Sequence, residues 1–397
     1  MSVIKAIAQD EGVNPRHVKR GIENGSIVIL KTKSGNKHVG IGKGLTTKVN
    51  ANVGTSSECT DYKDVLKKAH VAVKAGVHTL MELSTIGIDC KMNFAGCISA
   101  LADETGIPVG TVPVYEATRR GMERAGDSSI NLDAEEMLDV VARQAEHGSS
   151  FMAIHVGLNK KSLEFWRKEP RNIVSKGGYL TAEYMLRTGN ENPYFERFDD
   201  LLKILKKYDV VLNIGSALRS GSTRFNDSAQ LAELKVGAEL AEIASAAGVQ
   251  VVIEGPGHVP YGMIAEMVKT QQSLCNKRPF FVLGFVPTDC FSGRDHIVSA
   301  IGATEAVRHG ASWLCYVTSA EHHRMPTVHD VKEGVIAARM AAHIGDCARN
   351  QPKALALEHE FNDKGCLDPS AKKQYCSMCG QDFCPIRRFN TIKESVL

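Results

Sequence analysis

Residues 251–258 read Val-Val-Ile-Glu-Gly-Pro-Gly-His, an apolar run followed by a carboxylate, a glycine-rich loop and an imidazole. The run has the length of a strand, and its unbroken apolar character is typical of a strand covered on both faces in a parallel sheet. The loop is either a tight connection from strand to helix or part of a functional site. This stretch therefore predicts a parallel sheet with polar side chains at the carboxyl end of a strand.

Similar short β-rich runs alternate with amphipathic segments from residue 46 onward. The apolar spacing of Ala134–His147, Ala229–Ala247 and Val328–Asn350 favours helices. Alternating strands and helices are typical of an α/β protein, and we predict a (β/α)8 barrel. Such a barrel needs eight strands, so one of the nine candidate runs is expected to be an extra or irregular segment. The runs are TKVNAN (47–52), HTLMELS (78–84), PVGTVPVY (108–115), FMAIHVG (151–157), RNIVS (171–175), DVVLNIG (209–215), VQVVIEG (249–255), PFFVLG (279–284) and SWLCYVTS (312–319).

The regions on either side of this barrel are more polar. Residues 1–45 are expected to form a small peripheral extension with a helix over Pro15–Asn24 and a strand over Ser26–Leu30. Residues 351–373 are interpreted as a connector to a cysteine-containing tail. The chain is therefore divided into an N-terminal extension (1–45), a barrel domain (46–350) and a C-terminal tail (351–397).

The tail contains the sequence Cys-Ser-Met-Cys-Gly-Gln-Asp-Phe-Cys-Pro at residues 376–385. Its cysteines have the spacing C-x2-C-x4-C, and no further cysteine or histidine follows them. Three thiolates can hold three irons of a [4Fe–4S] cluster and leave the fourth iron open to a ligand such as S-adenosylmethionine. A closed zinc site needs four protein ligands, so the alternative is a zinc-bound tail completed by Cys366 or by a distant histidine.

Composition narrows the class of protein. The chain has 397 residues, 43% of them hydrophobic, and a net charge of +3 without a Lys/Arg block. These values fit a barrel-sized core and predict neither a nucleic-acid partner nor a membrane surface. The N-terminus lacks the apolar segment of a signal peptide, and the eleven cysteines are an odd number. We expect a cytoplasmic protein in a reducing compartment.

Chemically capable side chains occur at or near the ends of the predicted strands. In a parallel barrel, catalytic groups come from the carboxyl ends of the strands, so these side chains are expected to converge. One of them alone, such as His155, is more easily explained as a structural residue. The set comprises Asn52, Met81, Tyr115, His155, the turn Ser175–Gly178, Arg219, Glu254 with His258, and His322.

Two of these features point to specific ligands. The turn Ser175–Gly178 offers backbone N–H groups, a hydroxyl and a cation, which suit a phosphate, although serine-glycine turns are often only turns. His258 and His322 each follow a different predicted strand, so they could meet as a two-histidine metal site with open positions. Two histidines without further ligands are weak support for such a site.

Several longer motifs together resemble the phosphomethylpyrimidine synthase family, the radical-SAM enzymes of thiamine biosynthesis. The resemblance implies a (β/α)8 barrel that acts on 5-aminoimidazole ribotide. It also implies a [4Fe–4S] cluster on Cys376, Cys379 and Cys384, with S-adenosylmethionine on the open iron. In this family the tail caps the partner's barrel in a domain-swapped homodimer, and an electron donor such as flavodoxin or ferredoxin is expected. The motifs are VNANVGTS, PVGTVPVYEA, GPGHVP, DHIVSAIGA, LCYVTSAEH and CSMCG.

The resemblance also assigns roles residue by residue. Ser175 and Gly177 match a Ser-Arg-Gly phosphate turn in which Lys176 replaces the usual arginine. His258 and His322 match the ligands of a divalent metal, usually taken to be zinc. Substrate contacts correspond to Asn52, Met81, Tyr115, His155, Ser216, Arg219, Glu254 and Phe281, of which Glu254, His155 and Tyr115 are the candidate catalytic residues.

Three departures from the thiamine enzymes affect the expected product. Residues 215–221 read Gly-Ser-Ala-Leu-Arg-Ser-Gly where the family has Gly-Asp-Gly-Leu-Arg-Pro-Gly. Phe281 replaces a tyrosine, and residues 285–294 lack the sequence motif that the family usually has at this place. The chain therefore looks most like the 5-hydroxybenzimidazole synthase subgroup, carbon–carbon lyases that supply the lower ligand of anaerobic cobalamin. The alternative is phosphomethylpyrimidine synthesis from the same ribotide.

Two hypotheses remain outside radical chemistry. A zinc-dependent lyase or hydrolase would use His258 and His322 as ligands and Glu254 as the base. An iron–sulfur sensor without catalytic activity would use only the tail cysteines.

Overall fold

The computed structural model describes residues 2–85, 94–126, 130–168, 172–224, 228–362, 375 and 377–396. Eight parallel strands close into a barrel in the order β10-β3-β4-β5-β6-β7-β8-β9. The predicted (β/α)8 barrel is confirmed. Its strands are β3 (Lys48–Val53), β4 (Thr79–Glu82), β5 (Val109–Thr111), β6 (Phe151–Ile154), β7 (Val211–Ile214), β8 (Val251–Glu254), β9 (Phe280–Val282) and β10 (Trp313–Cys315).

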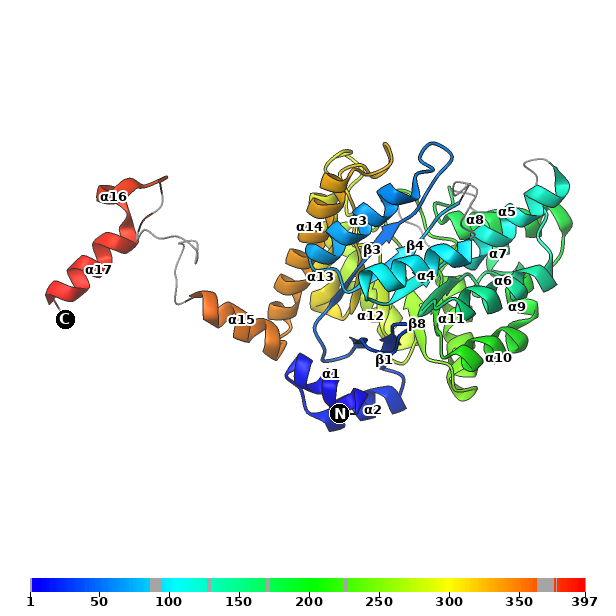
Figure 1. Ribbon diagram of the computed structural model, residues 1–397, viewed down its shortest axis with the longest axis horizontal. Helices are drawn as coiled ribbons and strands as arrows, with labels where there is room; N and C mark the ends of the chain where they lie inside the picture. The colour runs from blue at the N-terminus through cyan, green and yellow to red at the C-terminus, as the bar shows by residue number, and fades with distance from the viewer. Residues whose placement is uncertain are drawn as a thin grey trace.

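Helices surround this barrel (Figure 1). The three predicted helical segments form α6 (Ala134–Glu146), α11 (Ser228–Ala246) and α14 (Val328–Ala348). α14 packs against both α13 and α3. The remaining helices of this layer are α3 (Tyr62–Lys74), α4 (Phe94–Thr105), α5 (Pro113–Ala125), α7 (Lys160–Lys168), α8 (Lys176–Thr188), α9 (Pro193–Glu196), α10 (Phe198–Tyr208), α12 (Tyr261–Leu274) and α13 (Asp295–His309).

Aromatic side chains fill the barrel below its carboxyl end. Phe151 on β6 contacts Trp313 on β10 edge-on, with ring centroids 4.7 Å apart. Phe281 on β9 stacks on the same indole at 4.3 Å. Strands β6 and β10 are not neighbours, so these rings meet across the interior. Because the interior is filled there, a ligand can be accommodated only nearer the carboxyl ends of the strands.

The ninth candidate strand, residues 171–175, is not a barrel strand. Residue 171 lies outside the described residues, and Ile173 forms only an isolated bridge to Ser220. Ile173 instead packs against a small apolar cluster that includes Leu158 and Leu218. Its apolar character therefore reflects packing in a loop rather than pairing in the sheet.

The N-terminal extension contains more regular structure than predicted. α2 (Pro15–Glu23) and β1 (Ile27–Lys31) lie where a helix and a strand are expected. The extension also contains a second helix, α1 (Val3–Glu11), and a second strand, β2 (His38–Gly42). β1 and β2 form an antiparallel pair. A cluster of apolar side chains holds this extension together: Ile7, Ala8, Val18, Ile27, Ile29 and Leu45.

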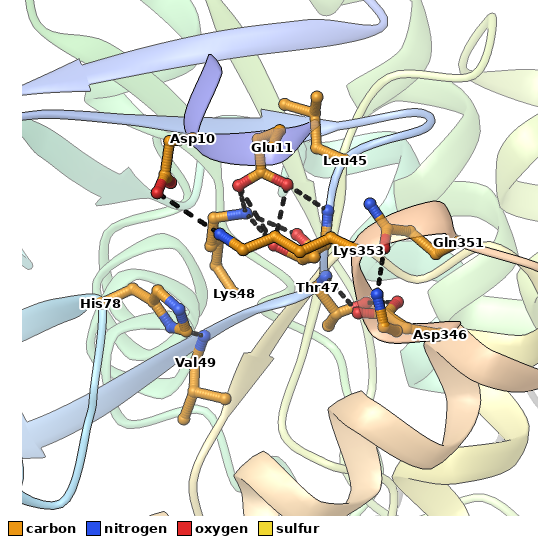
Figure 2. Close-up of polar contacts among 12 residues, drawn as sticks. Asp10, Glu11, Leu45, Thr47, Lys48, Val49, His78, Asp346, Gln351 and Lys353 are labelled. Carbon is orange, nitrogen blue, oxygen red and sulfur yellow. Dashed lines mark hydrogen bonds and ion pairs between the residues drawn. The ribbon is translucent and has the colours of Figure 1, made fainter. Parts of the chain in front are cut away.

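Buried polar contacts attach the extension to the barrel (Figure 2). Lys48, at the start of β3, donates to Glu11 of α1 at 2.8 Å, and their side chains are only 4% and 2% exposed. Asp346 of α14 accepts from the backbone N–H and the hydroxyl of Thr47, at 2.8 and 2.7 Å. The amino end of the barrel thus binds both the extension and the last turn of α14.

The predicted connector after residue 350 begins as a helix, α15 (Pro352–Asn362). The tail contains α16 (Gly380–Phe383) and α17 (Pro385–Val396), which lie apart from the barrel in Figure 1. Several apolar tail side chains are highly exposed, among them Met378 at 93% and Phe383 at 79%. Among the described helices, none is long and apolar enough to cross a membrane.

A buried carboxyl at the end of barrel strand β4 predicts a pH effect on stability. Glu82 follows Met81 on β4 and accepts hydrogen bonds from Ser84, and burial raises its pKa to about 7. The unfolded chain loses this proton near its ordinary pKa, about 4.3, so stability falls as the pH rises between the two values. Glu82→Gln should remove this loss and stabilise the protein at pH 8 by up to about 3 kcal/mol.

The measurement is the midpoint of urea unfolding at pH 5 and pH 8. Glu123→Gln, which changes an exposed carboxyl on α5, is the matched control and should show no gain at pH 8. Equal behaviour of the two variants at pH 8 would show that the pKa of Glu82 is not raised in the folded protein.

Candidate active site

Most of the predicted substrate residues line one cavity of about 60 Å³ at the carboxyl end of the barrel. A second cavity of about 280 Å³ adjoins it and shares Asn52, Leu83 and Leu283. Eight of the predicted substrate-contact residues line the first cavity. These are Asn52, Met81, Tyr115, His155, Ser175, Arg219, Glu254 and Phe281.

Two of these residues reach the cavity from positions that differ from the prediction. The sequence places Tyr115 at the end of a strand, but β5 ends at Thr111 and Tyr115 lies in the first turn of α5. Ser175 is expected after a fifth strand, but it is the N-cap of α8. Both side chains are nevertheless held at the cavity, because the helices that carry them begin there.

The N-terminus of α8 lies against His155. Ser175 Oγ is 2.9 Å from His155 Nε2 and accepts from the Gly178 N–H at 3.1 Å. A Cβ on Gly177 would lie 2.4 Å from the His155 ring, and one on Gly178 would lie 2.4 Å from the Cα of Ala217. Glycines are therefore required here, and the positive end of the α8 dipole lies at this point, which suits an anion.

Arg219 and Glu254 form an ion pair in the cavity wall, with side chains 17% and 13% exposed. Burial raises the pKa of Glu254, although the Arg219 guanidinium opposes this. Burial, and then Arg219, lower the pKa of His155 to about 3, so its imidazole is neutral at physiological pH. Burial also raises the pKa of Tyr115 to about 12, so this phenol keeps its proton. The cavity therefore combines neutral donors and acceptors with one charged pair.

Several polar atoms around this cavity lack a protein partner. His155 Nδ1, Ser216 Oγ and Arg219 Nε are buried and make no hydrogen bond within the described part of the chain. Unsatisfied buried polar atoms are costly, so several of them near one cavity favour a polar ligand. Lys176 lies at the edge, with its ammonium 5.4 Å from the centre of the Tyr115 ring.

The two predicted metal-binding histidines do meet. The ring centroids of His258 and His322 are 5.3 Å apart. His258 Nδ1 lies 2.9 Å from Asp289 and His322 Nδ1 lies 3.3 Å from Asp295, both to carboxylate oxygens. A carboxylate on Nδ1 leaves Nε2 as the ligand atom, which is the usual arrangement around metal-bound histidine. His322 also has φ of 63°, a left-handed conformation that is uncommon outside glycine.

The tail cysteines are described only in part. Cys379 and Cys384 flank the single turn of α16, the first exposed and the second buried. Cys376 lies outside the described residues. Their thiols are donors of a type that binds iron or zinc.

Sequence reasoning missed the residues that orient the histidines and shape the cavity. Asp289 lies in the segment 285–294, where the sequence shows only that the usual motif of the family is absent. Asp289 also accepts from the backbone and hydroxyl of Thr223, at 2.8 and 2.9 Å. The available signal was a carboxylate in a loop that follows a predicted strand. The remaining lining residues are Leu83, Val112, Ala153, Leu283 and Cys315, which are apolar or weakly polar.

Comparison with known proteins settles the family. The model of the Radical SAM ThiC family matches residues 1–365. The chain belongs to this family. Phosphomethylpyrimidine synthase of Carboxydothermus hydrogenoformans is 44% identical over 364 residues, which cover 90% of this chain and 83% of that protein. The synthase of Thermus thermophilus is 40% identical, with 96% and 92% coverage, and that of Methanocaldococcus jannaschii is 39% identical, with 96% and 94% coverage.

Among solved structures, dihydropteroate synthase of Thermus thermophilus covers 81% of this chain and 99% of its own, with 14% identity and a TM-score of 0.46. A likeness at this level carries no argument about function. Membership of the radical SAM ThiC family, by contrast, implies a [4Fe–4S] cluster and S-adenosylmethionine. The thiols of Cys379 and Cys384 are of the type that such a cluster needs.

Proposed function

We propose that this chain converts 5-aminoimidazole ribotide to a phosphorylated hydroxymethylpyrimidine, the phosphomethylpyrimidine synthase activity for which its relatives are named. The observation that carries the proposal is the convergence of eight predicted substrate residues on one cavity of a radical-SAM family barrel. Because these relatives are named for the pyrimidine product, we favour it over the benzimidazole that the sequence departures predict.

The phosphate of the ribotide is assigned to the N-terminus of α8. Ser175 supplies a hydroxyl there, and Gly177 and Gly178 permit close approach of the backbone. The positive end of the helix and the Lys176 ammonium favour a dianion. This anchor would fix the ribose between the helix terminus and the strand ends.

The remaining polar groups are assigned to orientation and proton transfer at the ribose and imidazole. Neutral His155 can donate or accept a hydrogen bond without changing charge, and the Tyr115 phenol can donate one. Glu254 is the best candidate proton acceptor, because burial raises its pKa toward the range useful for a base. Arg219 holds this carboxylate in place through their ion pair.

The cofactors follow from the donor atoms. We assign the cluster to Cys376, Cys379 and Cys384, reduced by a donor such as flavodoxin or ferredoxin. Its open iron would supply the site at which S-adenosylmethionine is reductively cleaved to a 5′-deoxyadenosyl radical. We assign a divalent metal, zinc being the best match to two imidazoles, to Nε2 of His258 and His322. Asp289 and Asp295 would orient these rings and strengthen them as ligands.

A homodimer is proposed from exposed apolar side chains at helical spacing. Ile297 and Ile301 on α13 are 50% and 54% exposed, and Met340 and Ile344 on α14 are 58% and 52% exposed. The two helices pack against each other, so these residues extend over neighbouring surfaces. Exposed apolar side chains on adjacent helices favour burial against another chain. The exposed apolar tail fits a tail that docks on the partner's barrel.

A second candidate, 5-hydroxybenzimidazole synthase, is favoured by one part of the site. In the loop 215–218, Ser216 stands where the family has an aspartate, and Ala217 stands where it has a glycine. The Ser216 N–H donates to Glu254. The backbone of Ala217 lies directly against Gly178. Phe281 stacks on Trp313 at a position where the family has a tyrosine. Lost polar contacts at these positions can redirect a substrate radical, since each is worth about 1–3 kcal/mol.

Replacing Lys176 by glutamate should weaken ribotide binding by about 1–3 kcal/mol, because an attractive charge at the phosphate becomes repulsive. The measurement is the Kd for 5-aminoimidazole ribotide by calorimetry on anaerobic protein. Lys161→Glu, an exposed position on α7, is the matched control and should leave the Kd unchanged. An unchanged Kd for Lys176→Glu would place the phosphate elsewhere.

The product distinguishes the two candidates. Reconstituted protein is incubated anaerobically with S-adenosylmethionine, a strong reductant and ¹³C-ribose-labelled ribotide, and the product is analysed by mass spectrometry. We expect a phosphorylated hydroxymethylpyrimidine that retains ribose carbons. A benzimidazole with ribose carbons in its six-membered ring would instead select the second candidate.

A further inference from the structure

A cluster of metal-binding side chains lies outside the candidate active site, where α14 meets α15. His343 and Cys347 are four residues apart near the end of α14, so they lie on the same face of that helix. Glu358, on α15, reaches back toward them. One ligand atom from each of the three residues lies within 4.8 Å of the other two.

The distances fit one ion among the three groups. Cys347 Sγ is 3.7 Å from His343 Nε2, and His343 Nε2 is 2.7 Å from Glu358 Oε1. Zinc bonds of about 2.0–2.3 Å in tetrahedral geometry place neighbouring ligand atoms roughly 3.3–3.6 Å apart. The sulfur–nitrogen separation is close to this value, and the carboxylate would need to move outward by less than about 1 Å.

We propose that His343, Cys347 and Glu358 bind a divalent cation of the zinc class, and that this ion fastens α15 to the end of α14. A thiolate, an imidazole and a carboxylate are a mixed donor set that suits Zn²⁺ better than Ca²⁺ or Mg²⁺. The His343 and Glu358 side chains are 29% and 46% exposed, so water can reach the fourth position. This site is separate from the two-histidine pair and from the tail cysteines.

The position of the cluster gives the ion a structural role. Asp346, next to Cys347, is buried and anchors Thr47 of the barrel, so this end of α14 is fixed. α15 continues from it toward the tail (Figure 1). Burial and the carboxylates of Glu358 and Asp346 raise the pKa of Cys347, so an ion that binds here must displace the thiol proton. A bound ion would therefore hold the base of the tail against the barrel.

The test uses Co²⁺ as a spectroscopic probe on full-length protein in which Cys376, Cys379 and Cys384 are replaced by serine. Cobalt bound to a thiolate gives an intense sulfur-to-metal absorption that an all-histidine site cannot give. We expect this absorption in the background protein, its loss on Cys347→Ser, and its retention on Cys290→Ser, an exposed cysteine outside the cluster. Absence of the band, or its persistence after Cys347→Ser, would overturn the site.

Two further measurements separate an ion from a simple hydrogen bond between His343 and Glu358. Glu358→Gln can keep that hydrogen bond but loses a charged ligand, so Co²⁺ affinity should fall at least about tenfold. Addition of Zn²⁺ should displace Co²⁺ and slow hydrogen exchange of the α15 amides. An unchanged Co²⁺ affinity in Glu358→Gln would show that the carboxylate is not a ligand. Unchanged hydrogen exchange of the α15 amides would show that the ion does not hold α15 to α14.

Discussion

Replacing Cys384 by alanine is expected to abolish cleavage of S-adenosylmethionine while the barrel stays folded. Cys384 is the buried C-cap of α16, and a cluster that loses one of three thiolates cannot keep three irons in place. The tail contributes little to the barrel, because its helices lie apart from it (Figure 1). Cys379→Ala and Cys376→Ala should behave in the same way. The measurements are 5′-deoxyadenosine formation by chromatography and the circular dichroism of the barrel.

Cys290→Ala is the matched control, since this cysteine is exposed but lies outside the tail. It should retain both the visible absorption of the reconstituted cluster and turnover. Full turnover in any of the three tail variants would mean that the thiolates are assigned wrongly. A colourless, zinc-loaded protein after anaerobic reconstitution would favour the zinc-dependent alternative.

Replacing Lys48 by alanine should destabilise the protein by about 3–5 kcal/mol. The change leaves the Glu11 carboxylate buried without its cation (Figure 2). Lys48 also donates to the backbone oxygen and the hydroxyl of Thr46, at 2.6 and 2.9 Å, so these bonds are lost as well. Although burial opposes it, Lys48 holds the pKa of Glu11 below its ordinary value. The measurement is the free energy of urea unfolding, followed by circular dichroism.

Two comparisons separate loss of the pair from loss of a long side chain. Lys31→Ala breaks an ion pair with Asp209 in which both side chains are about half exposed, and it should cost less than about 1 kcal/mol. The double replacement Glu11→Leu with Lys48→Met removes both charges and should recover most of the loss. Equal costs for Lys48→Ala and Lys31→Ala would show that the buried pair does not attach the extension.

The barrel could be predicted from sequence because its strands are continuous apolar runs separated by amphipathic helices. All eight barrel strands lie within or overlap the nine predicted runs. Residues 171–175 resemble a strand because Ile173 and Val174 are apolar, but Val174 is 44% exposed and belongs to a loop. The helix α15 is not evident from sequence because it has no strong apolar periodicity. Local pattern alone could not show that Glu11 pairs with Lys48, because that contact depends on how the extension folds onto the barrel.

The candidate site was predictable to a similar extent. Residues at strand ends converge because barrel geometry brings all strand ends together, which explains Asn52 and Glu254. Arg219 lies in the loop that follows β7. Tyr115 and Ser175 reach the cavity through helix starts, so their proximity required the structure. The pairing of Asp289 with His258 was not predictable, since it joins two loops through tertiary packing. Cys376 lies outside the described residues, so its role rests on family resemblance and spacing.

The central claim is that the barrel cavity and the tail cysteines together carry out radical chemistry on a ribotide. It is tested most directly by incubating reconstituted, reduced protein with S-adenosylmethionine, with and without 5-aminoimidazole ribotide. We predict that 5′-deoxyadenosine accumulates with ribotide present while the ribotide disappears in parallel, and that neither change occurs in Cys384→Ala. Consumption of the ribotide without 5′-deoxyadenosine, or no reaction of a fully loaded protein with both compounds, would contradict the account.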